Sequence, residues 1–240
     1  MDTSKLLSSI GSAEVKGRVY SIIQRLQSDY WLEIDLKDFK HAQENNKTWF
    51  DLITVLNWYA HNFKPKYYLE VGVRRGRSMA QVLVESPNTE VFGFDIWRLD
   101  YGTDIVNGVY VTSPGRDFVL DEFRRLGVSK APLLIDGISQ KTLVDFFNNP
   151  DFPKEIDLIA VDGDHTYLGA KSDLDIAFKR LSPGGALIFD DINHEYHIEL
   201  GVLWKEFKLL YPDHLFIQDS FNRGVGVAFR PPFDYLFDGI

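Results

Sequence analysis

The sequence predicts an α/β fold, with a mostly parallel sheet of seven strands, helices between the strands and an antiparallel hairpin at the end. Short apolar runs alternate with segments of helical periodicity from Tyr67 onward, which is typical of strands joined by crossover helices. Two consecutive runs, 158–161 and 186–189, end abruptly in acidic residues. The last two runs, 215–218 and 224–229, are joined by a short turn, which indicates a hairpin.

Composition restricts the function classes. The chain has 240 residues, enough for one large α/β domain with an appendage. Its formal net charge of −9 argues against broad binding to nucleic acid or to an anionic membrane, because both need a basic surface. The absence of cysteine excludes disulfides, thiolate catalysis and a cysteine zinc site. There is no secretory signal pattern or long apolar span, so we expect a soluble cytoplasmic protein.

The first 63 residues are expected to form a helical cap or substrate region. Apolar residues at helical spacing predict an amphipathic helix over 13–27. Residues 28–47 are interpreted as an ordered loop or short helix over the site. Thr48 and Asp51 have the spacing of a capping box, which predicts a second helix from Thr48 to the breaker at 64–66. These helices either cap the monomer or pair with another subunit in a homo-oligomer.

The second region, 64–240, opens with a nucleotide-type pattern. The apolar strand 67–73 carries Glu70 and leads through Gly72-x-x-x-Gly76 into a helix that ends near residue 85. A helix N-terminus presents free N–H groups, and glycine permits close approach of a ligand. The next strand, 91–94, ends in Asp95, about 25 residues after Glu70, where an acid that binds ribose hydroxyls is expected. The alternative for Asp95 is an ordinary solvated strand-end acid.

The following segments complete the predicted elements. Residues 98–116 form a long loop, which is either a substrate lid or a surface insertion. Further elements are then expected: a helix over 117–126, a strand over 132–135 that leads into Asp136-Gly137-Ile138-Ser139, a helix over 141–147, and a helix over 197–210.

Residues 156–191 contain the chemistry that we expect to matter most. Asp162-Gly163-Asp164-His165 follows one apolar run, and Asp190-Asp191 ends the next. Ligands of open α/β sheets bind at the carboxyl ends of the strands. Carboxylates there suit a hard divalent cation, and crowded carboxylates without a cation would repel one another. We therefore expect a divalent metal and a catalytic base at this edge, with His194 as a further candidate for contact with substrate or metal.

Three motifs resemble those of the S-adenosylmethionine-dependent O-methyltransferases, which have the Rossmann-like class I methyltransferase fold. They are LEVGVRRGRS (69–78), VDGDHTY (161–167) and LSPGGALIFDD (181–191). The resemblance covers roughly residues 65–230 and is greatest to the metal-dependent enzymes that modify sugars and natural products. The cephalosporin hydroxylase family is a relative with a similar motif pattern. Region 64–240 would accordingly be the S-adenosylmethionine-binding domain.

The resemblance implies a role for particular residues. Glu70, Gly72 and Gly76 would line the methionine end of the cofactor, with Ser78 nearby and Asp95 on the ribose. Asp162, Asp190 and Asp191 would hold the metal, usually Mg²⁺, and Asp164 or His165 would be the base. Relatives often carry Gly-Asp-Ser after the third strand, whereas this chain has Gly137-Ile138-Ser139. Ile138 could pack on the adenine ring, and Ser139 could hydrogen-bond to it.

The implied activity is methyl transfer to a hydroxyl of a sugar, glycan or natural product. The choice between Asp164 and His165 stays open, although the ordinary pKa of histidine favours His165 slightly. A non-catalytic cofactor-binding or assembly subunit is the alternative. A nicotinamide-dependent dehydrogenase should show GxGxxG and a hydrolase GxSxG, and the chain has neither motif.

Overall fold

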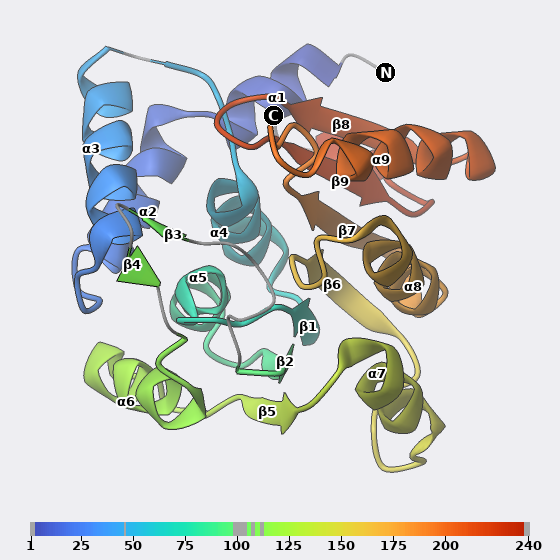
Figure 1. The fold of residues 1–240 in the computed structure, drawn as a ribbon. Coiled ribbons are helices and arrows are strands. Elements are labelled where there is room, and N and C mark those ends of the chain that lie inside the picture. Colours follow the sequence, from blue (N-terminus) through green and yellow to red (C-terminus); the bar gives the residue numbers. More distant parts are fainter. Residues whose placement is uncertain (1–2, 46, 98–104, 107–108, 111–112, 238–240) are drawn as a thin grey trace.

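The fold is taken from a computed structural model that describes residues 3–45, 47–97, 105–106, 109–110 and 113–237. A seven-stranded sheet runs through the molecule in the order β5-β2-β1-β6-β7-β9-β8 (Figure 1). Strands β5, β2, β1, β6 and β7 are parallel, and β9 lies antiparallel between β7 and β8. The predicted fold class, with its closing hairpin, is confirmed. The strands are β1 (Tyr67–Val71), β2 (Glu90–Asp95), β5 (Leu133–Asp136), β6 (Ile156–Val161), β7 (Leu181–Asp190), β8 (Leu215–Asp219) and β9 (Val225–Phe229).

Helices cover both faces of the sheet (Figure 1). Helices α1 to α6 pack on one face and α7 to α9 on the other. The period of two along each strand divides the core accordingly: Tyr68 of β1 packs with the first group and Leu69 with the second. The helices are α1 (Thr3–Ile10), α2 (Ala13–Ile23), α3 (Tyr30–Glu44), α4 (Leu52–Phe63), α5 (Arg77–Glu85), α6 (Arg116–Leu126), α7 (Ser139–Asn148), α8 (Tyr167–Phe178) and α9 (Ile198–Leu210), followed by the 3₁₀ turn η1 (Asp234–Phe237).

The N-terminal region differs from the prediction in two places. Residues 28–47 contain the fifteen-residue helix α3 rather than a loop or short helix. The predicted helix start at Thr48 is wrong, because α4 begins at Leu52 and the capping box joins Asp51 to Thr54. Two tertiary hydrogen bonds explain why the helix begins later than predicted. The amide of Phe50 donates to Asp219 Oδ2 (3.2 Å), and Lys16 donates to the carbonyl of Lys47 (2.8 Å).

Two other segments depart from the predicted boundaries. The sequence predicts a strand over the apolar run 186–189, whereas β7 begins earlier, at Leu181, and includes Ser182-Pro183-Gly184-Gly185. Its pairing with β6 is irregular between Ile156 and Leu158. The expected loop 98–116 contains the short strands β3 (Ile105–Val106) and β4 (Val109–Tyr110), which pair with each other. Most of the remainder of that loop lies outside the described residues, and the lid and insertion interpretations both stay predictions.

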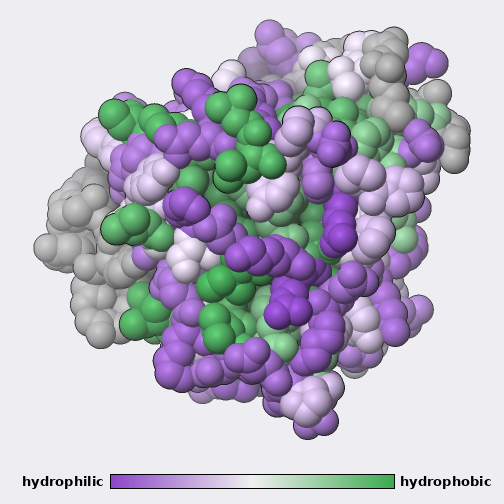
Figure 2. Space-filling view, turned by 90° about the vertical axis from the view of Figure 1, so that its right-hand side faces the viewer, coloured by the Kyte–Doolittle hydropathy of each residue, from purple (hydrophilic) through white to green (hydrophobic). Residues whose placement is uncertain are grey.

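The outer face over α8 and α9 is mixed in character. Figure 2 shows this side with apolar residues in several groups separated by hydrophilic ones. Leu168 of α8 and Ile198 and Leu209 of α9 are among the exposed large apolar side chains, and scattered exposure of this kind is normal for a protein surface. Within the part of the chain that the structure describes, no helix is long and apolar enough to cross a membrane.

Candidate active site

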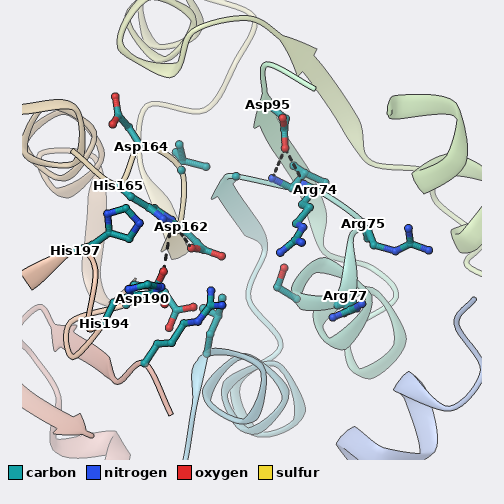
Figure 3. A pocket seen from close by; sticks show the side chains of 18 of the residues that line it. Arg74, Arg75, Arg77, Asp95, Asp162, Asp164, His165, Asp190, His194 and His197 are labelled. Atoms are coloured by element: carbon teal, nitrogen blue, oxygen red, sulfur yellow. Dashed lines mark hydrogen bonds and ion pairs between the residues drawn. The ribbon is translucent and has the colours of Figure 1, made fainter. Parts of the chain in front are cut away.

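A cavity of about 850 Å³ lies at the carboxyl ends of the parallel strands, a size typical of small-molecule sites. Figure 3 shows the labelled histidines with Asp162, Asp164 and Asp190 on one side of it, and Asp95 with the three labelled arginines on the other. Ile34 and Asp35 of α3, together with residues 51–53 at the start of α4, complete the wall. The cavity therefore joins the predicted cofactor half, the predicted acidic half and the N-terminal helices.

The turn after β1 is held in shape by Asp95 at the end of β2. One carboxylate oxygen of Asp95 accepts from the amides of Val73 (2.8 Å) and Arg74 (2.7 Å), and the other accepts from the amide of Trp97 (2.6 Å). Arg74 and Trp97 have positive φ angles of 50° and 56°, which non-glycine residues seldom adopt. Asp95 thus lies on the cavity wall and fixes the loop that a cofactor would contact.

Packing within the protein and positive φ angles require glycine at both positions of this turn. Gly72 has φ +90°, and a Cβ atom there would lie 1.9 Å from the carbonyl oxygen of Asp162. Gly76 has φ +73°, and its Cβ would lie 2.7 Å from the ring of Phe123 on α6. Gly72 lines the cavity, whereas Gly76 packs behind it.

Glu70 lies beneath the cavity floor and Ser78 lies on it. Glu70 is buried, and its carboxyl oxygens accept hydrogen bonds from Ser78 Oγ and Tyr68 Oη at 2.5 Å each. Burial raises the pKa of Glu70 to about 8, although both hydrogen bonds lower it. Ser78, Ile138 and Ser139 line the cavity.

The acidic residues after β6 and β7 converge on one another. Ligand atoms of Asp162, His165 and Asp191 all lie within 4.8 Å of one another, which is close enough to share one metal ion. His165 Nε2 is 3.4 Å from Asp162 Oδ1 and 3.6 Å from Asp191 Oδ2. Burial, together with the charges of Asp162 and Asp191, raises the pKa of Asp190 well above its ordinary value. This donor set fits a divalent cation, which would relieve the repulsion between the carboxylates.

His165, rather than Asp164, belongs to this cluster. The carboxylate of Asp164 accepts from the amide of Thr166 (2.8 Å) and packs against Gly169, so it lies at the start of α8. Figure 3 shows Asp164 pointing away from the labelled acids. Burial lowers the pKa of His165, but the hydrogen bond to Asp162 and the charges of Asp162 and Asp191 outweigh burial and raise this pKa to about 9.

Several further residues of the site were not predicted. His197 was expected only as the start of a helix, yet its ring centroid lies 5.0 Å from that of His165 and 4.6 Å from that of His194. The basic run after Gly72 also has structural partners: Arg75 pairs with Asp29 (2.8 Å) and Arg77 with Asp35 (3.3 Å). These pairs join the turn to α3. The three arginines within residues 74–77 were the only sign in the sequence of these ion pairs. Their partners could not be predicted, because Asp29 and Asp35 lie about forty residues earlier in the chain.

A protein family described as "Methyltransferase domain" matches residues 69–192, just over half of the chain. This chain belongs to that family. The matched segment includes the turn after β1, both acidic strand ends and Ser139. The resemblance to class I methyltransferases is therefore confirmed at the level of the family.

Comparisons with individual proteins show how far this likeness extends. An uncharacterised protein of Sinorhizobium fredii is 24% identical over 225 residues, which are 90% of this chain and 22% of that protein. The chain thus spans about a fifth of the length of the curated relative that it matches.

Solved structures of similar fold include two O-methyltransferases. TomG from Streptomyces achromogenes, solved with S-adenosylmethionine, has a TM-score of 0.56 at 14% identity, covering 85% of this chain and 91% of that chain. An O-methyltransferase from Bacillus cereus in complex with S-adenosylhomocysteine has a TM-score of 0.55 at 14% identity, covering 73% and 79%. At such low identity these likenesses show the fold alone.

Proposed function

We propose that the protein transfers the methyl group of S-adenosylmethionine to a hydroxyl oxygen of a sugar, glycan or natural product, with the help of a divalent cation such as Mg²⁺. The observation that carries this proposal is the convergence of Asp162, His165 and Asp191 in the same cavity as the turn after β1. A non-catalytic cofactor-binding subunit would not need an acidic cluster beside the donor site.

The donor half of the proposed site lies over β5, β2 and β1. Asp95 would receive the ribose hydroxyls, and Ser78 and Gly72 would meet the methionine end of the cofactor. Glu70 and Gly76 support this surface from behind, the first by holding Ser78 and the second by packing on α6.

The acceptor half lies over β6 and β7. Asp162, Asp190 and Asp191 would hold the cation, which supplies Lewis acidity that lowers the pKa of a bound hydroxyl. In this assignment His165 is the base and not a metal ligand, and it would take the hydroxyl proton on Nε2 while the oxygen attacks the methyl carbon. A cation held by Asp162 and Asp191 would offset the two charges that raise the pKa of His165, so that Nε2 can be unprotonated. The C–S bond breaks with its electron pair on sulfur and leaves neutral S-adenosylhomocysteine. Much of the barrier reduction would come from holding the two reactants in line.

Residues of the N-terminal region would shape the acceptor pocket. Ile34 and Asp35 of α3, with Leu52 and Ile53 of α4, line the cavity. We accordingly assign residues 1–63 to the acceptor side and 64–240 to the cofactor-binding domain. Small-molecule acceptors fit a cavity of about 850 Å³.

The substitution Asp191→Ala tests the division between the two halves. We expect it to abolish methyl transfer and to weaken the binding of Mn²⁺, followed by electron paramagnetic resonance, at least about tenfold, because one of the converging ligands is lost. The affinity for S-adenosylhomocysteine, measured by calorimetry, should stay within about threefold of the parent. Asp164→Ala is the control, since its carboxylate lies at the start of α8. A large loss of cofactor affinity in Asp191→Ala would instead place Asp191 in the donor site.

A further inference from the structure

We propose that Asp29 couples the donor site to the part of the cavity wall that α3 forms, because its carboxylate holds both the turn after β1 and the start of α3. Occupancy of the donor site would then fix α3, whose Ile34 and Asp35 line the cavity. Asp29 is a positioning residue in this account, since it acts through Arg75 and Arg77. The inference rests on the proposed binding of S-adenosylmethionine and deepens it by joining the two halves of the proposed site.

Asp29 forms ion pairs with two arginines of the turn after β1. Its Oδ2 lies 2.8 Å from Arg75 Nε, and its Oδ1 contacts Arg77. The three side chains are only 16% to 17% exposed, so the loss of one charge would leave its partners unpaired in a poorly solvated place. Burial raises the pKa of Asp29, but the hydrogen bond from the amide of Leu32 and the charges of both arginines outweigh burial and hold this pKa below its ordinary value of 3.8. Asp29 is therefore ionised at neutral pH.

The same carboxylate caps α3. Oδ1 of Asp29 accepts from the amide of Leu32 (2.8 Å) as the N-cap of the helix. Further along α3, Asp35 Oδ2 lies 3.3 Å from Arg77 Nη1. The start of α3 is therefore attached to the turn after β1 by charged contacts, whereas the helix packs mainly on α2. The segment held by these contacts is the one that carries Ile34 and Asp35 along the cavity.

The proposed donor contacts lie on both sides of the two arginines in the chain. Gly72 and Ser78, which precede and follow them, line the cavity. Between these two residues, Asp95 accepts from two amides of the turn. Arg75 is also held by α6, where its guanidinium lies 4.4 Å from the ring centroid of Phe118. A ligand that contacts Gly72 and Ser78 would therefore restrict the backbone between them and, with it, the position of both arginines.

Such an arrangement links two local equilibria. Helix α3 lies at the edge of the molecule (Figure 1), and local opening of peripheral elements is part of the native ensemble of a protein. Opening of α3 requires that the ion pairs of Asp29 break. A turn that is fixed by ligand keeps the arginines in the paired position, so opening becomes less favourable. By thermodynamic reciprocity, the turn binds its ligand more tightly when α3 is in place.

Hydrogen–deuterium exchange with and without saturating S-adenosylhomocysteine tests this coupling. In the parent protein the ligand should slow exchange of the α3 amides at least about fivefold, the lower end of typical coupling between sites. The measurement is made at about pH 8, because burial raises the pKa of Asp35 to about 7, against the lowering effect of Arg77, and its carboxylate is mostly ionised there.

Asp29→Asn separates the ion pairs from the helix cap, because asparagine is an equally good N-cap and carries no charge. The variant is studied at a ligand concentration that calorimetry shows to be saturating. Slowing of exchange should then persist in α5, which follows the turn directly, and should fall below about twofold in α3, because the coupling is lost.

Glu44→Gln is the matched control, because it removes an exposed carboxylate near the end of the same helix. It should leave the slowing of exchange in α3 unchanged. Exchange in α3 that is not slowed in the saturated parent protein, or that is slowed equally in Asp29→Asn, would overturn the inference. The parent decides the matter alone if Asp29→Asn does not fold. Failure of the parent to bind S-adenosylhomocysteine in calorimetry would instead refute the proposed function.

Discussion

Glu70 is a buried carboxyl group whose charge state is set by the fold. It is 1% exposed, its hydrogen bonds come from two hydroxyl groups, and burial raises its pKa to about 8. In the unfolded chain it would ionise near its ordinary value of 4.5. The folded state therefore binds one more proton than the unfolded state between these two pH values. Stability contributed by this group is fully present below about pH 4.5 and is lost as the pH rises toward 8.

Glu70→Gln removes this titration while retaining the shape of the side chain. We expect the free energy of unfolding of the variant, relative to that of the parent, to rise by at least about 1 kcal/mol between pH 5 and pH 8. Urea denaturation of both proteins across this interval measures the difference. Glu155→Gln, on the surface, is the matched control. A difference that stays constant with pH would show that Glu70 is ionised in the folded protein.

The residue types of the site could be predicted from the sequence better than their individual positions. The acids at the ends of β6 and β7 were expected to meet, and Asp162 and Asp191 do so. The choice between Asp164 and His165 could not be made in advance. It depends on the start of α8, where Asp164 is held by the amide of Thr166. The hydrogen bonds of the buried Asp173 with Ser139 and Gln140 could not be predicted, because these partners are more than thirty residues away in sequence.

At the scale of elements, the contact between β1 and β6 joins the two halves of the site. The two strands pair in parallel from Tyr68 to Val71, and the amide of Asp162 donates to the carbonyl of Val71 (2.8 Å). The chain leaves β1 through Gly72 directly beside the backbone of Asp162. The turn after β1 and Asp162 therefore have a fixed spacing that depends on the absence of a side chain at position 72.

Gly72→Ala should disrupt this contact. The added Cβ would overlap the carbonyl of Asp162, and the positive φ is strained for alanine, so we expect a loss of at least about 3 kcal/mol in stability. Gly127→Ala is the control, because Gly127 also has a positive φ (+78°) but no atom lies within 4 Å of its Cβ position. It should cost only about 1 kcal/mol. Chemical denaturation measures both, and equal losses would contradict the close approach of the strands.

Elements were predictable where local pattern and tertiary environment agree. The strands and most helices follow from apolar periodicity, since each buries one stripe or face. The start of α4 could not be predicted in this way. Two tertiary hydrogen bonds, from Phe50 to Asp219 and from Lys16 to the carbonyl of Lys47, hold the chain before Asp51 outside the helix. The full length of α3 was also missed. Its Asp29 caps the helix by accepting from the amide of Leu32 (2.8 Å) and also pairs with Arg75.

At the scale of the whole molecule, the strand order arranges the proposed reaction along one edge of the sheet. From β5 to β7 the edge presents Ser139, Asp95, the turn after β1 and the acidic cluster. Helices α3 and α4 close the cavity from the N-terminal side. The family and the fold could be predicted from three motifs, because those motifs are the turns at this edge. The particular residues of α3 and α4 that line the cavity could not, since these helices carry none of the three motifs.

Calorimetric titration with S-adenosylhomocysteine tests the central claim most directly. The parent protein is predicted to bind this product in a saturable manner with one site per chain, with or without Mg²⁺, because donor and cation occupy different strand ends. Asp95→Ala should weaken binding about tenfold, the effect of losing a charge-assisted hydrogen-bond partner. Saturable binding that is weakened by Asp95→Ala is the result that the account predicts, and no binding by the folded parent protein would contradict it.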